Sequence, residues 1–307
     1  MITDQLIEKI IDLQNPTCVG LDTLFDYLPD SMKEGVTSFE GVAERVFEFN
    51  KKLIDTLYDI IPSVKVQIAY YEMYGVAGMK AFEETVKYAK EKDLIVIADA
   101  KRNDIGSTAS CYAKTFLGKT AVNQNALQAF PADYVTVNGY LGADGILPFV
   151  EECQKNEKGI FVLVKTSNPS GAEIQNVILE NGKPMFEHVG ALVEKWGEST
   201  VGTYGYSAVG AVVGATHPTE AKRLREILPH TFHQLASHAV CQTNEFRFRR
   251  TGTATYIAEY HCFTDRFWST SGRSSIRQWH CPRDIASGTS AIYVVLQKHI
   301  TRWQPAH

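Results

Sequence analysis

The sequence predicts a parallel (β/α)8 TIM barrel in which strands 1–6 are clear and strands 7–8 are degraded or replaced. Across residues 1–229, six short apolar runs alternate with helix-length stretches, and this alternation indicates a parallel sheet. Polar residues follow the strands at their carboxyl ends, as in barrel enzymes. No glycine-rich GxGxxG turn opens the first unit, so an open dinucleotide-binding sheet is less favoured.

The predicted strands are short apolar runs, most of them rich in β-branched residues. They cover residues 18–22, 64–69, 94–99, 134–138, 160–167 and 208–216. The predicted helices carry apolar residues three or four positions apart and cover residues 3–13, 38–60, 74–91, 142–154, 184–197 and 218–228. Ser38 is the expected N-cap of the second helix, and Pro218 is expected to start the last one.

The third predicted strand ends in the charged motif Asp-x-Lys-x-x-Asp, formed by Asp99, Lys101 and Asp104. Side chains two positions apart in a strand point to the same face, so Asp99 and Lys101 should lie together. A surface turn with a salt bridge is the plain alternative. The strongly apolar strand before the motif favours a functional site at the carboxyl end of the barrel.

Lys65 lies inside an apolar strand, where an unpaired ammonium group would be costly, so it needs a nearby acid. Asp99 on the neighbouring strand is the expected partner. Asp22, at the end of the first strand, could be a turn cap or a ligand. Ser167 could similarly cap the Asn-Pro turn that follows it or contact a substrate.

Composition excludes several classes of protein. The chain has 307 residues and a net charge of −4, which gives no reason to expect a nucleic-acid or acidic-membrane partner. No apolar run approaches the ~18 residues of a membrane span, and no secretory signal is recognisable. The six cysteines lack CxxC spacing, so we expect reduced thiols in a cytoplasmic protein.

Residues 230–307 differ in composition from the predicted six-unit domain at 1–229, and they take the place of its last two units. The domain carries 18 Lys and 4 Arg, whereas the tail carries 1 Lys and 8 Arg. Seven of the nine histidines but only four of the 35 acidic residues lie in the tail. Its one clear strand signal covers residues 291–296.

Three hypotheses can account for this tail. A separate basic module would cluster its charges, but only Arg247, Arg249 and Arg250 do so. A metal-binding segment would use the His-Cys pairs at 261–262 and 280–281, which lack the usual ligand spacing. A shifted reading frame explains the simultaneous change in Lys, Arg, His, Trp and Cys content and is the leading hypothesis.

The motifs of this chain resemble those of orotidine 5′-phosphate decarboxylases, in the branch with Lys-Thr-Ser-Asn-Pro-Ser. The resembling segments occur in order and comprise residues 19–22, Lys65 and residues 99–108, 136–138 and 164–171. The resemblance implies a homodimeric (β/α)8 barrel that converts orotidine 5′-monophosphate to UMP and CO2 without a cofactor or metal.

The same resemblance implies roles for the charged residues. Lys101 would be the proton donor, and Asp99 and Lys65 would belong to its charged network. Asp104 would reach into the active site of the neighbouring subunit. A protonated lysine aimed at the ring carbon can stabilise the charge left by departing CO2 and then supply the proton.

The implied substrate-binding residues form a second group. Asp22 and Lys65 would hold the ribose hydroxyls, and Ser167 would read the pyrimidine. Ile105 and Thr108 would accompany Asp104 into the partner's site. The family's phosphate motifs, Pro-Gly-x-Gly-x-Gln-Gly-Gly and Arg-Gly, are not in this chain, so its phosphate ligands remain unassigned.

Two other functions compete with this one. A magnesium-dependent sugar-phosphate decarboxylase or aldolase of the same superfamily would need a further metal-binding carboxylate. A catalytically impaired barrel, or an interaction protein created by the tail, would bind no nucleotide and gain no thermal stability from UMP.

Overall fold

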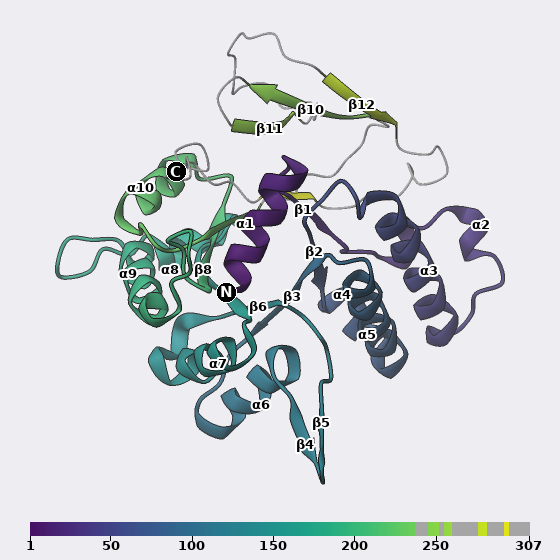
Figure 1. The fold of residues 1–307 in the computed structure, drawn as a ribbon, viewed down its shortest axis with the longest axis horizontal. Helices are drawn as coiled ribbons and strands as arrows, with labels where there is room; N and C mark the ends of the chain where they lie inside the picture. The colour runs from purple at the N-terminus through teal and green to yellow at the C-terminus, as the bar shows by residue number, and fades with distance from the viewer. Residues whose placement is uncertain (237–244, 252–254, 260–275, 281–291, 295–307) are drawn as a thin grey trace, which may run out of the picture.

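In the computed structural model, the described residues are 1–236 and the segments 245–251, 255–259, 276–280 and 292–294. Eight strands close into a barrel in the spatial order β1-β13-β9-β8-β7-β6-β3-β2 (Figure 1). These strands are β1 (Thr17–Gly20), β2 (Ser63–Gln67), β3 (Ile95–Arg102), β6 (Tyr134–Val137), β7 (Gly159–Lys165), β8 (Val209–Gly214), β9 (His233–Ala236) and β13 (Ile292–Val294). The six predicted strands are all present.

Helices follow the first six parallel strands and surround the barrel (Figure 1). The longer ones are α3 (Phe39–Leu57), α5 (Gly75–Glu91), α6 (Gly106–Leu117), α7 (Ala143–Asn156), α9 (Met185–Gly197) and α10 (Pro218–Ile227). One more helix, α1 (Ile2–Leu13), precedes β1. Short helices and 3-10 turns lie in the connections: η1 (Phe25–Tyr27), α2 (Asp30–Lys33), α4 (Ala69–Glu72), η2 (Gly139–Leu141), η3 (Pro169–Gly171), α8 (Ala172–Gln175) and η4 (Glu198–Thr200). The Ser38 side chain accepts a hydrogen bond from the Gly41 N–H at 3.2 Å, which confirms the predicted N-cap.

Helix α6 was not predicted. Its first turn is made of small and polar residues, so it shows no apolar pattern in the sequence. The buried side chains come later, at Ala109, Ala113, Phe116 and Leu117, with helical spacing. Packing of this stripe against the barrel accounts for the helix where local propensity is weak.

The last two strands differ from the first six. β9 continues the parallel series, with Ala211 of β8 opposite His233, so a seventh parallel strand follows residue 229. β13 lies within the predicted strand at 291–296, but it runs antiparallel to both β1 and β9. A reversed strand therefore takes the eighth position of the barrel.

The core has two layers. Helix side chains pack against the outer face of the sheet, and a smaller cluster fills the interior near the amino ends of the strands. Leu6, Ile7 and Ile10 of α1 belong to the inner cluster, so this helix closes that end of the barrel. The Asp4 carboxylate accepts the N–H groups of Thr203 and Tyr204, each at 3.1 Å, and fixes α1 to the loop before β8.

Two further sheets lie outside the barrel. The hairpin β4 (Thr120–Val122) and β5 (Asn125–Leu127) projects beyond α6, and β10 (Glu245–Thr251), β11 (Thr255–Glu259) and β12 (Ile276–His280) form an antiparallel sheet (Figure 1). The predicted arginine cluster lies on β10. Of the two His-Cys pairs, only His280 lies within the described residues. No helix in the described part has the length and apolar character needed to cross a membrane.

Candidate active site

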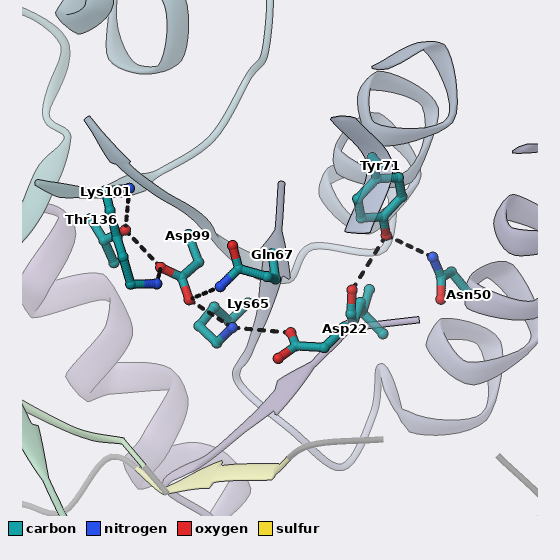
Figure 2. Close-up of polar contacts among 9 residues, drawn as sticks. Asp22, Asn50, Lys65, Gln67, Tyr71, Asp99, Lys101 and Thr136 are labelled. Atoms are coloured by element: carbon teal, nitrogen blue, oxygen red, sulfur yellow. Dashed lines mark hydrogen bonds and ion pairs between the residues drawn. The ribbon is translucent and has the colours of Figure 1, made fainter. Parts of the chain in front are cut away.

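Four of the five predicted charged site residues, all except Asp104, meet at the carboxyl ends of β1, β2 and β3. The buried Lys65 ammonium lies 3.1 Å from Asp22 Oδ1 and 2.9 Å from Asp99 Oδ2. Lys101 Nζ lies 2.6 Å from the other Asp99 oxygen. Positive and negative groups thus alternate in the order Asp22, Lys65, Asp99 and Lys101 (Figure 2). The expected contacts of Asp99 with Lys65 and Lys101 are confirmed.

Asp99 is the most heavily bonded member of this chain of charges. Besides the two lysines, Gln67 Nε2 donates to Oδ2 at 2.8 Å and Thr136 Oγ1 donates to Oδ1 at 2.8 Å (Figure 2). Each carboxylate oxygen therefore contacts one ammonium group and one neutral donor. Burial raises the pKa of Asp99, but Lys65 and Lys101 outweigh it and hold that pKa well below its ordinary value.

Lys101 is placed by an irregularity in β3. Its φ is +47°, in the left-handed region that non-glycine residues seldom occupy. The pairing of β3 with β6 changes register between Ala98 and Arg102, as expected for a bulge. The Lys101 side chain is 47% exposed, whereas that of Lys65 is 2% exposed, so Lys101 is the more accessible of the two lysines.

Asp22 follows β1 in a loop supported by buried polar side chains. Asn50 Nδ2 donates to the Tyr71 hydroxyl at 2.8 Å, and that hydroxyl points toward the Leu21 carbonyl (Figure 2). Thr23 Oγ1 donates to Asn50 Oδ1 at 2.6 Å. These contacts hold the residues on both sides of Asp22.

Ser167 lies in the loop after β7, which two contacts hold in place. The Gln175 side chain accepts the Thr166 N–H at 3.0 Å and donates to Thr166 Oγ1 at 2.7 Å. A Cβ on Gly214 would lie 2.9 Å from the backbone N and Cα of Ser167, so only glycine fits beside this loop. The Thr216 hydroxyl also faces the Ser167 carbonyl, at 3.4 Å.

Asp104, Ile105 and Thr108 lie at the start of α6. Asp104 Oδ1 accepts the Ile105 N–H at 2.8 Å. Ile105 is 54% exposed, and Thr108 is also exposed, on the outer surface of the loop and helix. Ile105 and Thr108 are therefore accessible to a neighbouring molecule, and the half-buried Asp104 lies beside them.

Sequence reasoning did not single out Gln67 and Thr136 as site residues. Gln67 follows Lys65 by two positions in the same strand, and this alternation could have identified it. Thr136 lay in a matched motif without an assigned role, and only the pairing of β3 with β6 brings it to Asp99.

Comparisons with known proteins agree with this geometry. The profile of the "Orotidine 5'-phosphate decarboxylase / HUMPS family" matches residues 17–240. The orotidine 5′-phosphate decarboxylase of Caldicellulosiruptor saccharolyticus is 43% identical over 235 residues, which are 75% of this chain and 77% of the relative. The enzyme of that name from Clostridium kluyveri is 38% identical over 261 residues, 85% of this chain and 82% of the relative.

A solved structure of a candidate orotidine-monophosphate decarboxylase from Toxoplasma gondii has a similar fold. Its TM-score is 0.64 at 30% sequence identity, with 75% of this chain and 76% of that chain covered. The profile match spans the barrel strands from β1 to β9 and includes the four alternating charged residues. The chain belongs to the orotidine 5′-phosphate decarboxylase / HUMPS family.

Proposed function

We propose that this chain decarboxylates orotidine 5′-monophosphate to UMP in pyrimidine biosynthesis, with Lys101 as proton donor. The observation that carries the proposal is the alternating charge order Asp22, Lys65, Asp99 and Lys101 at the carboxyl ends of neighbouring strands. The relatives named orotidine 5′-phosphate decarboxylase at 38–43% identity support the same reaction.

The chemistry needs charge stabilisation at one ring carbon. When the carbon–carboxylate bond breaks, its electron pair stays on the ring carbon and CO2 leaves. The Lys101 ammonium, held by Asp99 at 2.6 Å, stabilises this charge and then transfers a proton to the carbon. The neutral amine regains a proton from solvent, which its exposure permits.

Asp99 contributes in a second way. Its low pKa keeps it ionised, so it repels the substrate carboxylate in the ground state. That repulsion disappears as neutral CO2 leaves, which lowers the barrier relative to the bound substrate. Lys65 would hold Asp99 in place and, together with Asp22, bind the ribose hydroxyls. Ser167 would contact the pyrimidine.

We also propose a homodimer with shared active sites. Asp104, Ile105 and Thr108 extend from the loop after β3, where they could enter a partner's site. The loops that follow the neighbouring strands expose apolar side chains, including Tyr140 at 83% and Ile174 at 61%. Exposed apolar residues that follow successive strands favour a protein–protein contact at this end.

The proposed location is the cytoplasm. Cys18, Cys111 and Cys153 are free thiols in the described part of the chain. Burial raises the pKa of the Cys18 thiol to about 12, so this cysteine remains an unreactive thiol in the barrel interior. Free thiols are typical of a reducing compartment.

One contact favours the decarboxylase over a metal-dependent relative. The Lys65 ammonium occupies the space between the Asp22 and Asp99 carboxylates, where a divalent cation would otherwise neutralise them. Turnover of orotidine 5′-monophosphate that persists in excess EDTA would support the decarboxylase. A requirement for added magnesium would favour the metal-dependent alternative.

The direct test is CO2 release by the full chain and by Lys101→Ala. We expect the variant to lose turnover and to retain its melting temperature and UMP binding, because Lys101 is the most exposed of the four alternating charged residues. Lys80→Ala, with a side chain 75% exposed on α5, is the matched control and should keep full turnover. Near-normal turnover in Lys101→Ala would contradict the assignment.

The tail and the dimer need separate measurements. A version with a family-like C-terminus restored after residue 240 should turn over faster than the full chain, because phosphate binding assists the transition state.

If sites are shared, a mixture of inactive Lys101→Ala and Asp104→Ala chains should recover activity through hybrid dimers. Absence of recovery with exchange of subunits demonstrated would contradict shared sites. The impaired-barrel alternative predicts no thermal shift with UMP.

A further inference from the structure

Thr136 joins two parts of the site through one hydroxyl group. This residue lies in β6, next to β3, and its side chain is buried. Its Oγ1 donates to Asp99 Oδ1 at 2.8 Å and accepts the Lys101 backbone N–H at 3.0 Å (Figure 2). A hydroxyl has one proton, so these two bonds determine its orientation.

The bond to Lys101 falls at the strained position of β3. Lys101 has φ +47°, and a non-glycine residue stays in this conformation only where its surroundings hold it. The ladder between β3 and β6 is interrupted there, between Ala98 and Arg102. Thr136 supplies the acceptor that the Lys101 N–H requires at the interruption.

The bond to Asp99 falls on the oxygen that contacts the lysine ammonium. Asp99 Oδ1 accepts from both Thr136 Oγ1 and Lys101 Nζ, the latter at 2.6 Å. The same hydroxyl therefore fixes the carboxylate and the backbone from which the lysine side chain extends. No other described side chain contacts both residues through hydrogen bonds.

We propose that Thr136 is a positioning residue for decarboxylation, which aims the Lys101 ammonium by holding its left-handed backbone and the Asp99 carboxylate together. The inference rests on the proposed function, since it assumes that Lys101 delivers the proton. Thr136 acts through these two residues, so its loss should reduce the rate of the chemical step more than ligand affinity.

The substitutions separate the hydroxyl from the side-chain volume. Thr136→Val keeps the shape and removes both hydrogen bonds, whereas Thr136→Ser keeps the hydroxyl. Thr200→Val is the matched control: Thr200 is also buried, donates to the Gly197 carbonyl at 2.8 Å and accepts the Ala208 N–H at 3.1 Å. Thr200 lies before the amino end of β8, away from Lys101.

The experiment measures kcat for orotidine 5′-monophosphate and the dissociation constant of UMP. We expect Thr136→Val to lower kcat roughly tenfold to a hundredfold, the range for a lost hydrogen bond to a charged group, with UMP affinity changed less than about threefold. Thr136→Ser should restore most of kcat, and Thr200→Val should leave it unchanged. If Thr136→Val does not fold, Thr136→Ala provides the same measurement with less steric demand.

Two kinetic results would overturn the proposal. One is a folded Thr136→Val enzyme with kcat within about twofold of the parent. The other is an equal loss of kcat in Thr136→Val and Thr200→Val, which would indicate a general effect of removing a buried hydroxyl. An inactive parent chain would instead contradict the proposed function. In that case the crystal structure of Thr136→Val tests the positioning role. A negative φ at Lys101 would support the role, and an unchanged φ with the Asp99 contact retained would overturn it.

Discussion

Replacing Lys65 by methionine removes the central positive charge of the site while keeping most of the side-chain volume. The ammonium is buried, 3.1 Å from Asp22 and 2.9 Å from Asp99, so the variant loses two short ion pairs at once. Asp99 keeps its contacts with Lys101, Gln67 and Thr136. Two buried carboxylates nevertheless lose the cation between them, and water has little access to replace it.

Breaking a buried pair by removing one partner costs about 3–5 kcal/mol of unfolding free energy. At roughly 2–4 °C per kcal/mol for a domain of this size, the melting temperature should fall by about 6–20 °C at pH 7. The folded-state pKa of Asp99 lies below its unfolded value, so its stabilising charge is fully present above about pH 4 and is lost as the pH falls through the folded pKa. In Lys65→Met the pKa of Asp99 rises. The difference in unfolding free energy between the parent and Lys65→Met should therefore be largest at pH 7. It should become smaller as the pH falls through the raised pKa of Asp99 in the variant.

Thermal unfolding followed by circular dichroism between pH 8 and pH 4 measures this difference. Lys80→Met is the control, because its side chain is 75% exposed and its loss should leave the melting temperature unchanged within about 1 °C. A loss below about 1 kcal/mol at pH 7 would refute the reasoning, since it would mean that the buried ion pairs contribute no more than exposed ones. A difference that does not vary with pH would show that the carboxylates are not its source.

Two further substitutions test other parts of the barrel. Gly214→Ala places a Cβ 2.9 Å from the Ser167 backbone, so the loop after β7 must shift. We expect the KM for orotidine 5′-monophosphate to rise several-fold, with a smaller change in melting temperature. An unchanged KM would argue against a substrate contact at Ser167. Asp133→Asn weakens the buried contacts with Lys90 at 2.6 Å and Lys158 at 2.8 Å, so urea unfolding should show a loss of about 2–4 kcal/mol while kcat is retained. Asp133 precedes β6, at the end of the barrel opposite to the charged site, so its loss should affect stability and leave catalysis unchanged. A stable Asp133→Asn variant with reduced kcat would contradict this expectation.

Much of the fold could be predicted because its parallel strands are buried on both faces and appear as uninterrupted apolar runs. Helices with a clear apolar stripe, such as α3 and α5, were predicted within three residues at each end. Helix α6 was not, because its stripe begins only at Ala109, after a polar first turn. The reversed direction of β13 also has no signature in a three-residue strand, since only pairing with β1 and β9 defines it.

The site residues also fall into two groups, those that the sequence could predict and those that it could not. Asp99, Lys65 and Lys101 were recognisable because charged side chains inside or directly after apolar strands need partners. Gln67 and Thr136 were not, because an uncharged amide or hydroxyl in a strand can be satisfied in many ways. Their importance follows from long-range pairing: Thr136 is 37 positions from Asp99, and Gln67 is 32.

The contacts that hold α1 against the barrel determine when this helix can pack during synthesis of the chain. Asp4 receives its hydrogen bonds from Thr203 and Tyr204, about 200 positions later, and the apolar face of α1 packs against strands up to β8. At 5–20 residues per second, the ribosome needs roughly 10–40 s to produce that partner. During this interval Leu6 and Ile7 have no barrel to enter, so the N-terminal helix presents an apolar face that a chaperone can bind. Helix α1 is therefore synthesised long before its partners and can dock only after the loop before β8 has been made.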